Sequence, residues 1–123
     1  MSTDALNLID EQLQALGINY EFGEWKSDIV YPYWVGTFAE TPGDKIEQDT
    51  TFTLDGFTRE SYLELLEQKE KIEKKYKHGL TAILGNGTGV AVLYENALCN
   101  LPTGDAELKK IQINLTIKEW SVI

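Results

Sequence analysis

The chain has 123 residues, enough to bury one hydrophobic core without disulfides or metals, and we expect a single domain over residues 1–123. Hydrophobic residues make up 42% and charged residues 25%, which excludes a disordered chain, and no apolar run approaches the ~20 residues that span a bilayer. The single cysteine, Cys99, forms no internal disulfide, as is typical of a reducing compartment.

The net charge of −9 belongs entirely to the first half of the chain. Residues 1–60 hold 12 acids and 3 bases, a net of −9, whereas residues 61–123 hold 8 acids and 8 bases, a net of zero. An acidic surface repels phosphate backbones, which excludes tight nucleic-acid binding. Two interpretations of the negative charge stay open. It keeps the protein soluble, or it forms a surface along which a polyanion passes without binding.

The first 40 residues predict one helix and two strands. A helix over 4–16 is indicated by an apolar stripe at spacings of three and four, formed by Leu6, Ile9, Leu13 and Leu16. Polar residues at 2–4 can cap its start, and Gly17 is a typical residue just beyond a helix end. Strands are expected over 18–25 and 30–40.

The strand at 30–40 carries large side chains on both faces. Alternation places Tyr31, Tyr33 and Val35 on one side, and Trp34 and Phe38 on the other. Pro32 lacks a backbone donor and favours an edge or the beginning of the strand. A helix of the same chain can cover one face; the other cover is either a neighbouring subunit or the rest of the core.

Residues 41–48 predict an acidic connection between two strands, with a Pro-Gly turn signal. Together with its flanking residues the segment holds four acids against one lysine, and the acids are Glu40, Asp44, Glu47 and Asp49. It is either an arm that reaches a partner or a solvated connection.

A strand over 49–57 and a helix over 61–77 form the best-defined unit of the sequence. Thr50, Phe52 and Leu54 alternate with polar residues, and the period then changes to a helical face formed by Tyr62, Leu65, Leu66, Ile72 and Tyr76. Ser61 has capping-box spacing to Glu64, and Thr58 is a competing cap. Three glutamates, at 67, 70 and 73, each precede a lysine by four residues, which favours the helix.

The rest of the chain predicts three strands, over 80–84, 89–95 and 108–123, with a loop over 96–107 in which a short strand stays open as an alternative. The glycine-rich segment GNGTG is not a phosphate loop, because no Lys-Ser/Thr pair and no helix follow it; Asn86-Gly87 instead indicates a hairpin turn. The last strand alternates Ile111, Ile113, Leu115 and Ile117 with polar residues, and its length predicts either a central strand or one that runs past the edge of the domain.

The order helix, three strands, helix, strands predicts an α+β fold: a mostly antiparallel sheet with two α-helices packed on one face. The strands that are apolar on both faces need more cover than two short helices provide. That mismatch predicts a homo-oligomer with closed symmetry.

No constellation of catalytic residues is visible. His78, the single histidine, lies at a helix end where capping explains it, and Arg59 is the single arginine. A triad needs a base held by a carboxylate, and a zinc site needs several His or Cys ligands. We therefore expect no enzymatic activity, no catalytic residues, no cofactor and no metal.

Several segments resemble small tail-completion proteins of long-tailed bacteriophages and prophages. They are residues 33–40, FTLDGFTRESYLELLEQKEKI, GNGTG with GVAVLYENA, and LPTGDAELKKIQINLTIKEW. The order of the elements also resembles the tail-terminator fold. A neighbouring neck role, in head closure or head–tail joining, stays open beside the tail-terminator role.

The resemblance implies a non-enzymatic virion protein, located in the tail or neck and in the host cytoplasm during assembly. In that family a ring, commonly of six subunits, caps the tail tube and offers a surface to the head connector, while DNA passes through the lumen without tight binding. The partners would be the protein itself, the tail tube protein and the head-connector protein, with no membrane. The family supplies no catalytic residues.

Two hypotheses about sites follow from hydrophobic and charge placement. The candidate contacts with a subunit or partner are Tyr33, Trp34, Phe38 and Trp120. The candidate acidic loop, facing a lumen or a partner, holds Glu40, Asp44, Glu47 and Asp49.

The alternative is a small α+β binding module that holds a peptide or a small ligand on its aromatic-rich sheet. Trp25, Tyr31, Tyr33 and Trp34 would line its pocket. The two functions differ in size in solution, because a binding module stays monomeric or dimeric.

Overall fold

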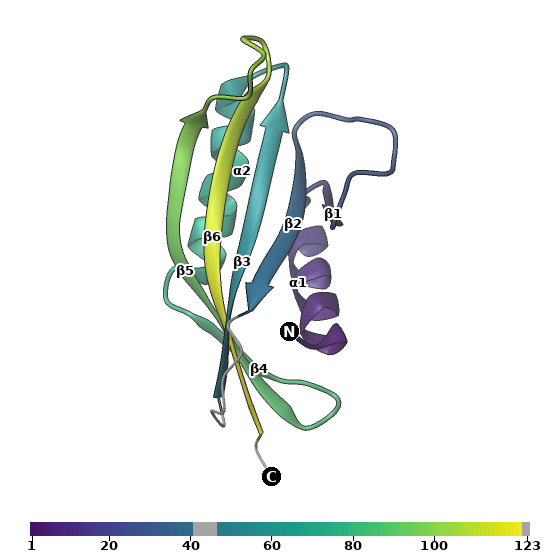
Figure 1. The fold of residues 1–123 in the computed structure, drawn as a ribbon, viewed down its shortest axis with the longest axis vertical. Helices are drawn as coiled ribbons and strands as arrows, with labels where there is room; N and C mark the ends of the chain where they lie inside the picture. The colour runs from purple at the N-terminus through teal and green to yellow at the C-terminus, as the bar shows by residue number, and fades with distance from the viewer. Residues whose placement is uncertain (41–46, 122–123) are drawn as a thin grey trace.

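The structure is a computed structural model that describes residues 1–40 and 47–121. In chain order the described elements are α1 (Thr3–Ala15), β1 (Tyr20–Phe22), β2 (Tyr33–Glu40), β3 (Glu47–Thr58), α2 (Tyr62–Tyr76), β4 (Leu80–Ile83), β5 (Thr88–Leu101) and β6 (Lys109–Ser121). The strands form one sheet in the order β1-β2-β3-β6-β5-β4 (Figure 1), and β6 takes the central position, one of the two alternatives that its length left open. Neighbouring strands are antiparallel except for the parallel pair β1–β2. The predicted α+β fold is confirmed.

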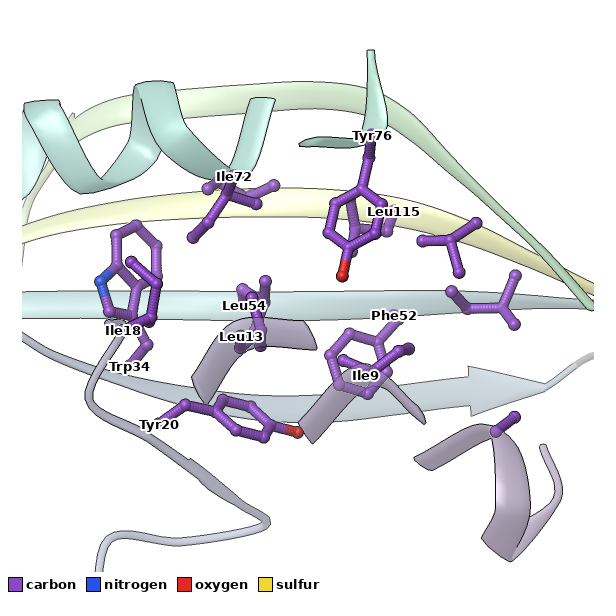
Figure 2. Close-up of a cluster of buried hydrophobic side chains, with 14 of the residues drawn as sticks. Ile9, Leu13, Ile18, Tyr20, Trp34, Phe52, Leu54, Ile72, Tyr76 and Leu115 are labelled. Carbon is purple, nitrogen blue, oxygen red and sulfur yellow. The ribbon is translucent and has the colours of Figure 1, made fainter. Parts of the chain in front are cut away.

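The hydrophobic core lies between the two helices and one face of the sheet. Figure 2 shows side chains from α1, α2 and the sheet meeting there, and its fully buried members include Ile9, Leu13, Trp34, Phe52, Leu54, Ile72, Tyr76 and Leu115. The Tyr76 hydroxyl donates a 2.8 Å hydrogen bond to Gln12 Oε1 and so ties α2 to α1. No helix of the described residues covers the opposite face, which is called the open face below.

Both helices begin at serines that were among the caps predicted from the sequence. The Ser2 hydroxyl accepts a hydrogen bond from the Ala5 N–H at 3.2 Å, and the Ser61 hydroxyl accepts one from the Glu64 N–H at 3.4 Å. Thr58, the competing cap, accepts instead from the Glu60 N–H in the preceding turn. Capping satisfies backbone donors that have no partner within the helix.

The predicted β4–β5 hairpin turn is confirmed. The Gly87 N–H donates to the Leu84 carbonyl at 2.9 Å, and the Leu84 N–H donates to the Thr88 carbonyl at 2.8 Å. Gly87 has a φ of +84°, which a glycine adopts without steric cost. The glycine-rich segment therefore serves to reverse the chain.

The first expected strand is shorter in the structure than its alternation predicted. The segment 18–25 forms a strand only over Tyr20–Phe22, because Gly23 turns the chain with a φ of +85°. The Glu21 carboxylate then accepts hydrogen bonds from the N–H groups of Lys26 and Ser27, which holds the turn.

Of the two alternatives for residues 96–107, the strand is present in the first half, where it is the continuation of β5 to Leu101 and not a separate short strand. The long strand β6 offers a hydrogen-bonding partner along that whole stretch. Irregularities in β5 accommodate the residues that had indicated a loop. The register shifts between Tyr94 and Asn96 and between Leu98 and Leu101, and Asn100 has a φ of +58°.

Candidate interaction surfaces

The open face carries a ladder of polar side chains that bond to one another across three strands. Thr53 Oγ1 donates to Asn114 Oδ1 at 3.0 Å, and Asn114 Nδ2 donates to Asn96 Oδ1 at 2.8 Å. One step further along, Thr116 Oγ1 donates to Glu95 Oε1 at 2.6 Å. Because these groups satisfy each other and water, the ladder needs no covering layer of protein.

Charges on the open face are also paired. Asp55 accepts a hydrogen bond from Gln112 Nε2 at 3.1 Å and lies 3.7 Å from Lys110 Nζ, while Asp49 lies 3.8 Å from Lys118 Nζ. Exposed pairs of this kind add little stability. They do balance charge: with Glu95, the ladder has three acids against two lysines, a net of −1.

At one end of the open face four aromatic side chains form what we call the aromatic row: Trp25, Tyr31, Tyr33 and Phe57. The Tyr33 ring is central, with its centroid 4.9 Å from that of Trp25, 5.8 Å from that of Tyr31 and 5.3 Å from that of Phe57. Lys110 Nζ lies 5.6 Å from the Phe57 centroid, within cation–π range. Burial raises the pKa of Tyr33.

An ion pair closes the end of the row. Arg59 lies 2.6 Å from Asp105 and also hydrogen-bonds the Tyr31 side chain. The Glu107 backbone N–H and the Arg59 guanidinium lower the pKa of Asp105. Asp105 belongs to the β5–β6 connection, and residues 100–106, 108 and 109 surround a hollow of about 340 Å³ there.

Large hydrophobic side chains are exposed at both edges of the sheet. Among the described residues, Phe22 and Phe38 are exposed at the β1–β2 edge and form what we call the β1–β2 patch, whereas Ile29 and Val30 are exposed in the loop that precedes Tyr31. Ile83 is exposed at the β4–β5 edge, and we call its surface the β4–β5 patch; Leu98 is also exposed but pairs with Gln112 near the other end of β5, far from Ile83, which pairs with Gly89. Within the first patch the rings of Phe22 and Phe38 stack with centroids 5.8 Å apart.

The structure separates the four predicted contact residues. Tyr33 lies in the aromatic row, and Phe38 is 37% exposed in the β1–β2 patch. Trp120 is half-buried over Gly89, where an added Cβ would lie 2.4 Å from its ring.

Trp34 needs a correction, since it is 0% exposed on the helix side of the sheet and its Nε1–H donates to Gln68 Oε1 at 2.8 Å. It is therefore a core residue and neither a subunit contact nor a pocket wall. Alternation along β2 points it away from Tyr33, and Gly56 opposite leaves room for its ring.

The predicted acidic loop is not one surface in the structure. Asp44 lies outside the described residues, and Glu47 is described only by its backbone at the start of β3, opposite Trp120. Glu40, at the end of β2, contacts the ammonium group of Met1 on the helix side, whereas Asp49 pairs with Lys118 on the open face. Two of the four acids therefore lie on opposite faces beside cations.

Sequence reasoning missed Phe57, Lys110 and Ile83. The alternation along β3 could have indicated Phe57. Its side chain points to the face opposite that of the buried residues Phe52 and Leu54. The position of Lys110 depends on the β3–β6 register, which pairs it with Phe57 and is not encoded locally.

Within residues 1–40 and 47–121, no helix is long and apolar enough to cross a membrane. In the same part of the chain, His, Cys, Asp and Glu side chains form no group of three that could hold a metal ion. The molecule is thus an α+β protein whose candidate sites are surfaces for contact. No protein-family model and no curated protein matches the chain in comparisons with known proteins.

Proposed function

We propose that this protein is a non-enzymatic assembly protein of a long-tailed bacteriophage or prophage. In this proposal it forms a ring that caps the tail tube and joins it to the head connector, and DNA passes through the lumen. The observation that carries the proposal is that hydrophobic side chains are exposed at opposite edges of one sheet, Phe22 and Phe38 at one edge and Ile83 at the other. A head-to-tail ring joins two different surfaces of each subunit, and these patches are suited to meet in that way.

The open face suits the lumen of such a ring. Its polar side chains bond to one another and stay hydrated, and its lysines lie within 4 Å of carboxylates. A hydrated surface with a net of −1 over the ladder offers phosphates little attraction. This assignment replaces the acidic loop with the ladder as the surface that DNA passes.

Size in solution tests the ring. We expect light scattering over a wide concentration range to detect species larger than a dimer, and negative-stain images of the heaviest fraction to show a central hole. A strictly monomeric protein with no rings in the images contradicts the proposal.

Two variants test the head-to-tail contact directly. Phe38→Glu and Ile83→Glu each destroy one patch, so each variant alone should be monomeric, and an equal mixture should form only a dimer through the one remaining pair of intact patches. Leu63→Glu is the matched control, because Leu63 is 64% exposed on α2 outside both patches. Rings that persist in either patch variant argue against this contact, provided that circular dichroism shows a native fold.

The aromatic row favours a second candidate function, a binding module for a peptide or a small ligand. Half-buried rings at one end of an otherwise polar face are typical of a recognition surface. A monomer that binds such a ligand through these rings would support this function in place of the ring.

A further inference from the structure

The aromatic row offers stacking surface but few unused polar groups. The two basic side chains that contact its rings already have partners: Lys110 lies beside Asp55, and Arg59 beside Asp105. A sugar site needs donors and acceptors that are ready for hydroxyl groups, so this arrangement favours a ligand that binds mainly by apolar contact.

A proline-rich segment in the polyproline II conformation fits that requirement. Its pyrrolidine rings pack between aromatic side chains, and its conformation is formed before binding, which lowers the entropic cost. The centroids in the row lie 4.9 to 5.8 Å apart, so adjacent rings are in contact and present a continuous apolar surface on which pyrrolidine rings can stack. Ile29 and Val30, both exposed, directly precede Tyr31 and extend the apolar surface.

The ring of Trp25 supplies one donor for such a segment. Its Nε1–H is buried and has no acceptor among the described residues. Polyproline II leaves its carbonyls without internal hydrogen bonds, so a small rotation of the indole would give this N–H a peptide carbonyl to bond.

The charge around the aromatic row indicates which sign of charge a partner would carry. Glu24 and Asp28 are exposed on the loop that carries Trp25, and within the described residues neither makes an ion pair. Lys26 is the one base in that loop, and residues 1–60 hold the whole excess of negative charge. Nucleic acid is disfavoured at such a surface, whereas a basic peptide is attracted.

We propose that the aromatic row is a docking site for an extended, proline-rich segment of a partner protein that carries basic residues. The inference does not depend on ring formation. The aromatic row contains no residue of either edge patch, and all of its side chains belong to a single chain.

The test uses the whole chain and a labelled oligoproline peptide that ends in two arginines. We expect saturable binding in fluorescence anisotropy, and the largest amide shifts in NMR spectra at Trp25, Tyr33 and Phe57. A Gly-Ser peptide of equal length with the same two arginines controls for charge and should bind at least about tenfold more weakly, a difference of about 1.4 kcal/mol.

Variants decide whether the row is the site. Tyr33→Ala and Trp25→Ala should each weaken binding at least about tenfold, while Phe22→Ala, which removes an exposed ring on the other side of the sheet, should leave it unchanged. Trp25 lies in a loop, so its variant keeps the test valid if Tyr33→Ala fails to fold. Equal binding of both peptides, equal loss in Phe22→Ala, or binding of a cello-oligosaccharide without the peptide overturns the proposal.

Discussion

At the scale of single residues, glycines in the sheet create space for large aromatic rings. Gly56 pairs with Trp34 across β2 and β3, and a Cβ at Gly56 would lie 2.6 Å from the Trp34 ring. Gly89 makes the same kind of space for Trp120. A glycine within a strand usually weakens it, so a packed ring above it is the compensating contact.

Gly56→Ala should destabilise the fold by about 1–3 kcal/mol, because the buried Trp34 ring cannot move away without losing its bond to Gln68. Gly85→Ala is the matched control, since an added Cβ there meets nothing within 4 Å. Urea unfolding monitored by tryptophan fluorescence measures both. Equal stability of the two variants would contradict the packing account.

Two buried tyrosines differ in how their hydroxyls are satisfied. The Tyr76 hydroxyl bonds to Gln12, whereas the Tyr20 hydroxyl has no partner among the described residues. Burial raises the pKa of both side chains above the ordinary value of 10.0, and Asp10 adds to the rise at Tyr20.

These raised pKa values predict a loss of stability in alkaline solution. Below pH 10 both tyrosines are neutral in the folded and unfolded chains; above it the unfolded chain releases protons that the folded chain keeps, so the free energy of unfolding falls as pH rises. Each tyrosine contributes a slope of about 1.4 kcal/mol per pH unit. Tyr76→Phe should lessen the fall by that amount, as urea unfolding at several pH values can measure; an equally steep fall in the variant would contradict this account.

At the scale of elements, the start of α1 is joined to the end of β6. The Ser2 N–H and hydroxyl both donate to the Glu119 carboxylate, with the hydroxyl bond at 2.8 Å, while the same hydroxyl caps the helix. One side chain thus stabilises the helix and attaches it to the sheet. A short helix of 13 residues is marginal alone, so this attachment matters.

Ser2→Ala should therefore lower the free energy of unfolding by about 1–2 kcal/mol, through the lost cap and an unpaired carboxylate. Thr3→Ala serves as the control, because Thr3 is exposed and next in the chain. Thermal unfolding by circular dichroism compares the two. If they are equally stable, Ser2 is not the effective cap.

The irregular part of β5 also affects how the sheet can associate. β4 pairs with β5 only as far as Val92, so the rest of β5 is an edge of the sheet. Two register shifts and the positive φ of Asn100 interrupt that edge. Natural sheets use such irregularities to prevent uncontrolled pairing. We therefore expect side chains of the β4–β5 patch, rather than the β5 backbone, to make the proposed subunit contact.

At the scale of the whole molecule, a net charge of −9 opposes self-association. Raising the salt concentration from about 0.01 M to about 0.15 M shortens the Debye length from about 30 Å to about 8 Å. If hydrophobic patches hold the proposed ring, its assembly should strengthen over this range. Light scattering at both salt concentrations measures the change; weaker assembly at the higher salt would instead indicate contacts between opposite charges.

Much of the candidate site was visible in the sequence as separate parts. Alternation correctly put Tyr31 and Tyr33 on one side of a strand and Trp34 on the other, and composition marked the 96–107 segment as irregular. Alternation alone did not reveal that Trp34 is fully buried, because the direction of a side chain does not say which face the helices cover.

The sequence by itself determined the kind and order of the elements apart from the extent of β5, the candidate caps at residues 2–4 and at Ser61 or Thr58, and the turn at Asn86-Gly87, because these depend on residues a few positions apart. Only the tertiary structure decided that Tyr33 meets Phe57 and Lys110, that Glu40 and Asp49 lie on opposite faces, and that hydrophobic residues are exposed at both edges of the sheet. Those relations depend on strand order and register, which the packing of the whole chain selects.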